Sequence, residues 1–101
     1  MRTLKPRHLT SRGAAEEVAL QALTFLAADP ERIGPLLAES GLAPNELRRV
    51  MRAPAFQVAV LDHLINRQEL LLLFAAHAQI DPGHAVAARE LLAHQGGDHD
   101  L

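Results

Sequence analysis

The chain has 101 residues, which predicts a single domain, and 49% of them are apolar, enough to build a core. It has no cysteine, so disulfides, thiolate metal sites and cysteine nucleophiles are excluded. The net charge of −2 is uneven: residues 1–12 hold four of the ten basic side chains and no acid. The rest of the chain is net acidic, which disfavours binding to a polyanion such as a nucleic acid. Aromatic residues are scarce, which disfavours a surface on which nucleic-acid bases stack.

The first twelve residues, MRTLKPRHLTSR, show no apolar periodicity. We expect a basic, disordered arm over 1–12, with contact to phosphate or to an acidic partner as the alternative. The segment does not resemble a secretion signal, because Pro6 and His8 fall where the apolar region of such a signal would lie. We therefore expect a cytoplasmic protein.

The first helix is predicted at about 14–28, with Ser11 available as its cap. Its apolar arc is wide enough to contact two neighbours. Asp29-Pro30 is typical of a second helix start, and Gly41 suits a left-handed stop. Between them, Gly34-Pro35 predicts a turn or a kink, because proline cannot donate a helical hydrogen bond.

Four further helices are predicted at about 44–52, 54–65, 67–79 and 82–93. Asn66 and Glu69 have the spacing of a capping box for the fifth, and Asp81-Pro82 repeats the cap-plus-proline start for the sixth. The polar tail 94–101 is expected to be disordered, which leaves 13–93 as the helical bundle domain.

No stretch has the alternation or turn pairs that strands need, so the chain is predicted to be all-α. Short connections favour a compact orthogonal bundle of five or six short helices. The seven apolar residues 70–76 predict a central helix that is buried on every side. The residues expected in the core are Phe25, Leu61, Leu64, Leu71, Leu72 and Phe74.

Residues 36–52, LLAESGLAPNELRRVMR, resemble a helix–turn–helix unit with Gly41 at the turn. On its second helix, Asn45, Arg48, Arg49 and Arg52 fall on the face opposite the apolar one. They are candidate nucleic-acid contacts, provided that all four project into solvent with no acidic residue covering them. The alternative is an ordinary pair of short helices, with arginines that suit a helix C-terminus.

Several helices carry more apolar surface than a domain of this size can bury. We therefore expect an exposed apolar patch or a self-association interface formed by Val58, Ile65, Leu70 and Leu73. The alternative is that these four residues belong to the core.

The six histidines lack the spacing of known metal motifs, and only the tail, with His94, Asp98, His99 and Asp100, groups several metal-ligating types. We predict no metal site and no cofactor. The chain also lacks a nucleophile elbow and a phosphate-binding glycine loop, so we do not expect an enzyme.

Three motifs give a resemblance to a family. They are residues 19–32 (ALQALTFLAADPER), residues 41–48 (GLAPNELR) and residues 54–62 (PAFQVAVLD), followed by the leucine-rich run and Asp81-Pro82. Together they resemble a small, mainly alphaproteobacterial family catalogued as domain of unknown function 3572, over about 14–93. Gly34-Pro35 departs from the continuous helix of that family. The resemblance implies a small helical bacterial protein and supplies no catalytic residue, ligand or partner.

From the residues, the favoured function is a protein-interaction module that binds a protein partner or a second copy of itself. The alternative is a DNA-binding helix–turn–helix protein that uses the arginine face. Association with a membrane is not expected, because the apolar run is far shorter than the roughly 18 residues that a span requires.

Overall fold

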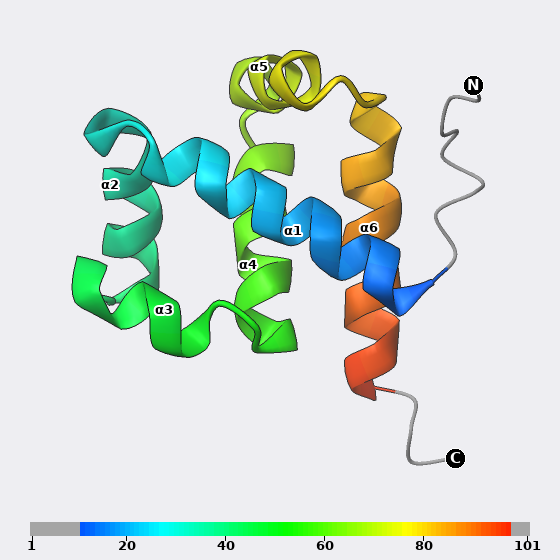
Figure 1. Cartoon of the computed structure of the whole chain (residues 1–101), viewed down its shortest axis with the longest axis horizontal. Helices are drawn as coiled ribbons and strands as arrows, with labels where there is room; N and C mark the ends of the chain where they lie inside the picture. The colour runs from blue at the N-terminus through cyan, green and yellow to red at the C-terminus, as the bar shows by residue number, and fades with distance from the viewer. Residues whose placement is uncertain (1–10, 98–101) are drawn as a thin grey trace.

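A computed structural model of the chain describes the backbone of residues 11–97 and the side chains of residues 11–94. Within this part, the chain forms six α-helices, one short 3-10 helix and no strand (Figure 1). The helices are α1 (Arg12–Ala27), α2 (Pro30–Ser40), η2 (Pro44–Glu46), α3 (Leu47–Val50), α4 (Pro54–Ile65), α5 (Gln68–Ala78) and α6 (Pro82–Gly97). The predicted all-α bundle is confirmed.

The core lies among α1, α4 and α6, which make the most extensive contacts in the fold. In Figure 1, α1 crosses in front of α4 and α6. It also contacts α2 and α5, so its wide apolar arc does meet several neighbours, as predicted. Ala85 and Ala88 on α6 are fully buried, and such small side chains let neighbouring helix axes come close.

The expectation that residues 70–76 form the buried centre is wrong. Their helix, α5, lies at the edge of the bundle, across one end of α4 and α6 (Figure 1). Leu71, Phe74 and Ala75 are buried at helical spacing, whereas Leu72 is 49% and Leu73 57% exposed. The other predicted core residues are buried, and Leu72 is the exception.

The second helix also differs from the prediction, because α2 runs through Gly34-Pro35 without interruption. Pro35 is exposed and stands sixth in the helix. The donor that it lacks would have bonded only to the carbonyl of Glu31 in the first turn. Both predicted ends are confirmed: Asp29 accepts a hydrogen bond from the Glu31 amide at 2.9 Å, and Gly41 ends the helix at a φ of 71°.

Three other boundaries depart from the sequence analysis. The predicted helix at 44–52 is a 3-10 turn followed by the single turn of α3. The capping box at Asn66 is wrong: Asn66 follows the last residue of α4, and α5 begins after Arg67 with no side-chain cap. α6 continues past Ala93 to Gly97, so part of the predicted tail is helical. Residues 98–101 of the predicted tail lie outside the described residues. So do residues 1–10 of the predicted arm, and the next residue, Ser11, caps α1.

Candidate functional site

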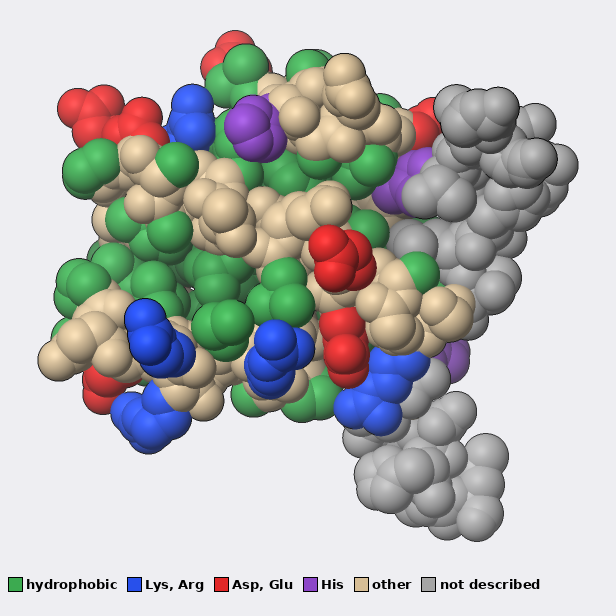
Figure 2. All heavy atoms as spheres, in the orientation of Figure 1, with side chains coloured by type: hydrophobic (Ala, Val, Ile, Leu, Met, Phe, Trp, Pro, Cys, Tyr) green, Lys and Arg blue, Asp and Glu red, His purple; other side chains and the backbone are tan. Residues whose placement is uncertain are grey.

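An open apolar groove lies between α1 and the segment that contains η2 and α3. Its volume is about 560 Å³. Leu23 is buried, whereas Leu20, Leu47 and Met51 are half-buried and still reach the hollow. We call this hollow the α1–α3 groove; its full lining is Leu20, Leu23, Thr24, Ala27, Ala28, Pro44, Leu47, Arg48 and Met51. Figure 2 shows hydrophobic side chains gathered in this region, with basic side chains along its lower edge.

The predicted arginine face borders this groove. Asn45, Arg48, Arg49 and Arg52 are all exposed, as a nucleic-acid contact requires. Such a contact also requires that no acidic residue covers these side chains. Arg49 does not meet this requirement, because its Nη2 lies 3.2 Å from Oε2 of Glu46. Within the described chain, Arg48 and Arg52 form no ion pair, and Arg48 lines the groove itself.

The predicted apolar patch does not form one exposed surface. Val58, Ile65 and Leu70 are half-buried against the core, and Leu73 alone of the four is exposed. On the described surface, the large exposed apolar side chains are Leu72, Leu73 and Val86. The α1–α3 groove is a separate apolar surface, which sequence reasoning missed because its walls are brought together only by the fold.

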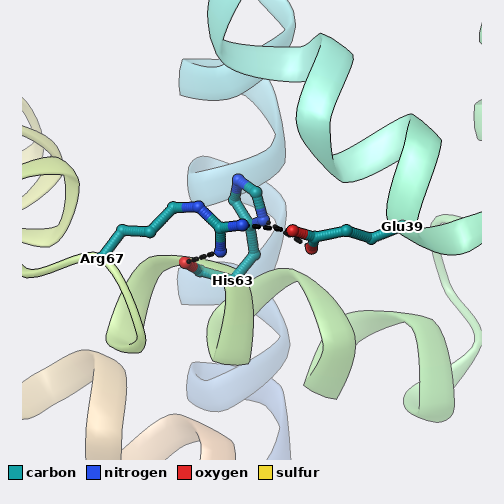
Figure 3. Close-up of polar contacts among 3 residues, drawn as sticks. All are labelled: Glu39, His63 and Arg67. Atoms are coloured by element: carbon teal, nitrogen blue, oxygen red, sulfur yellow. Dashed lines mark hydrogen bonds and ion pairs between the residues drawn. The ribbon is translucent and has the colours of Figure 1, made fainter.

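A polar cluster that the sequence analysis also missed joins α2 to α4 (Figure 3). The His63 side chain is only 1% exposed, and its Nδ1 lies 3.0 Å from Oε1 of Glu39. Arg67 pairs with the other Glu39 oxygen and donates to the His63 carbonyl at 3.1 Å. Because an ionised carboxylate only accepts hydrogen bonds, Nδ1 of His63 carries the proton in this contact.

The environment of Glu39 favours its charged form. The hydrogen bond from His63 lowers the pKa of the Glu39 carboxyl below its ordinary value, and Arg67 adds to this effect while desolvation opposes it. The Nε2 atom of His63 is buried and has no partner in the described chain. The cluster therefore fastens α2 to α4.

A second ion pair fastens α6 to α4. Nε of Arg89 donates to Oδ1 of Asp62 at 2.7 Å. Asp62 and His63 are adjacent in α4, so neighbouring residues of this helix bind α6 and α2. Glu39 and His63 are 24 positions apart, and Asp62 and Arg89 are 27 apart, too far for any local spacing to predict either contact.

The described residues contain neither a cluster of metal-ligating side chains nor a helix that could span a membrane. No group of three potential metal ligands comes together there, and Asp98, His99 and Asp100 of the tail lie outside this range. None of the helices described has both the length and the apolarity to cross a membrane.

No curated protein and no solved structure matches the chain. A family model described as "Protein of unknown function (DUF3572)" matches residues 12–95, which is most of the chain and includes both the groove and the polar cluster. The chain therefore belongs to the DUF3572 family.

Proposed function

We propose that the protein is an interaction module that binds an amphipathic segment of a partner protein in the α1–α3 groove. It acts in the cytoplasm, and it acts by binding rather than by catalysis. The observation that carries the proposal is the combination of apolar groove walls with Arg48, an arginine at the edge that has no acidic partner within the described chain.

The apolar walls define one half of the partner's chemistry. Leu20, Leu47 and Met51 keep part of their surface in water. Covering apolar surface yields about 25 cal/mol per Å². An amphipathic helix laid in a groove covers such walls with side chains at positions i, i+3 and i+4. Methionine adapts its shape to different partner side chains, which suits a wall of a binding surface.

Arg48 defines the other half. Its guanidinium presents several donors and no acceptor, so it favours an anionic group, and a carboxylate is the anionic group that an unmodified protein segment supplies. Thr24, Ala27 and Ala28 on the facing wall are uncharged, and no acid lines the groove. A partner segment with a carboxylate beside its apolar face is therefore complementary to the groove.

The DNA-binding alternative has less support. α3 is a single helical turn, whereas a recognition helix must enter the major groove and reach base edges. Of the three arginines on the predicted face, Arg49 is paired with Glu46. Arg48 and Arg52 fit an acidic partner segment equally well, without the need for a long helix.

Selection of short displayed peptides against the folded chain tests the proposal. Enriched peptides should be amphipathic and should carry an acidic residue beside their apolar positions. For such a peptide, Ala27→Glu should weaken binding by roughly tenfold or more, because it places bulk and negative charge in the groove. Arg48→Glu should weaken it by roughly fivefold and should reverse the salt dependence.

Leu72→Asp is the matched control, since it adds the same charge on the exposed outer face of α5. It should leave the peptide affinity unchanged. Failure to enrich any peptide, or enrichment of peptides whose binding responds to Leu72→Asp and not to Ala27→Glu, would contradict the proposal.

A further inference from the structure

Residues 42–53, which we call the α3 segment, form the most thinly packed part of the described bundle. None of their side chains is buried. Leu42, Leu47, Val50 and Met51 are half-buried and rest on the core. Every other helix contributes at least one fully buried side chain, for example Leu36 on α2 and Phe74 on α5. The α3 segment therefore gains less from burial than the helices around it.

Hollows lie on both sides of this segment. The α1–α3 groove lies on one side. On the other, an apolar hollow of about 480 Å³ lies among α2, the α3 segment and α4. Leu36 and Phe56 line this second hollow, and Val50 of the α3 segment lines it as well. The segment thus separates two apolar hollows and is not wedged tightly against either wall.

Few hydrogen bonds hold the α3 segment to the rest of the fold. Nε2 of Gln57, a buried residue of α4, donates to the Met51 carbonyl at 3.0 Å. Two backbone hydrogen bonds join its ends to the neighbouring helices: the Leu42 amide donates to the Leu37 carbonyl at 3.1 Å, and the Gln57 amide donates to the Ala53 carbonyl at 3.0 Å. The other hydrogen bonds of residues 42–53 in the described chain stay within the segment. Its two ends suit a hinge: Gly41 has a positive φ, and Pro54 begins α4 without a donor.

We propose that the α3 segment is a flap that opens by unfolding locally as one unit, which breaks its internal hydrogen bonds, while α1, α4 and α6 stay folded. Opening joins the two hollows into one apolar surface and moves Leu47, Arg48 and Met51 away from α1. The hydrogen bond from the Gln57 side chain to the Met51 carbonyl holds the flap closed, and we call Gln57 the latch. The opening is a property of the free chain and does not depend on the partner proposed above.

Native-state hydrogen exchange of the full chain, measured by NMR at increasing denaturant below unfolding, tests the flap. The informative amides are those of Glu46, Leu47 and Ala53, which are hydrogen-bonded within the segment. All three should share one opening equilibrium that hardly depends on denaturant. The amides of Leu61 and Leu64 in α4 should exchange at least roughly tenfold more slowly and depend steeply on denaturant.

The latch is tested by Gln57→Leu, which keeps the volume of the side chain and removes its donor. It should raise exchange in the α3 segment by roughly fivefold relative to exchange in α4. Gln68→Leu, at an exposed position of α5, is the control and should leave that ratio unchanged. If the three amides open with the steep denaturant dependence of α4, or open unequally, the flap does not exist. This wild-type result decides the matter even if Gln57→Leu fails to fold.

Discussion

The Nδ1 atom of His63 lies 3.0 Å from Oε1 of Glu39, so a histidine buried in α4 donates to a half-exposed carboxylate on α2. This contact ties the α2 end of the bundle to its centre. α2 leads through Gly41 into the α3 segment, so the contact holds in place the helix to which the α3 segment is attached.

The Glu39 contact makes stability depend on pH in acid. Because the pKa of Glu39 is lowered in the folded chain, its contribution is present above the ordinary value of 4.5 and is lost as pH falls through the folded value. Unfolding free energies of the wild type and Glu39→Gln should therefore converge between about pH 7 and about pH 3. Urea titrations at several pH values measure this difference. A constant gap over the whole range would show that Glu39 is not the group responsible.

Two neighbours in the apolar run of α5 should respond very differently to truncation. Phe74 is fully buried, and its ring centroid lies 5.6 Å from that of Phe25. Phe74→Ala should lower the free energy of unfolding by about 3–5 kcal/mol. Leu72→Ala should change it by no more than about 0.5 kcal/mol, because the side chain faces solvent. Chemical denaturation of the two variants measures these free energies. Equal losses for Phe74→Ala and Leu72→Ala would contradict the position of α5 at the edge of the bundle.

That pair of residues shows how far the sequence predicts the fold. Starts and stops that depend on nearby residues, such as Ser11, Asp29 and Gly41, are predicted correctly because the capping chemistry is local. The burial of Leu72 depends on where α5 sits among the other helices, and a uniformly apolar run carries no information about which side faces solvent. The Glu39–His63 contact and the α1–α3 groove join distant segments, so neither could be read from spacing.

The two glycines of the second helical region should respond to alanine with opposite signs. Gly41 has a φ of 71°, so Gly41→Ala should lower the stability by about 1–2 kcal/mol. Gly34 lies inside α2, where alanine is the better helix former, so Gly34→Ala should raise the stability by about 0.5–1 kcal/mol. An added Cβ meets no atom within 4 Å at either position, which makes the comparison one of backbone conformation alone. Thermal melts of both variants check the signs, and a gain at Gly41 would contradict the assigned left-handed turn.

The most direct test of the binding account is amide chemical-shift mapping of the full chain with a peptide selected against it. Binding in the α1–α3 groove predicts that the largest shifts fall on the end of α1, around Thr24 and Ala27, and on residues 44–51. The Arg48 side-chain signal should shift as well if it meets the peptide carboxylate. Shifts confined to α5, around Leu72 and Leu73, would contradict the account, because they would place the interaction surface on the exposed leucines of α5 and not in the groove.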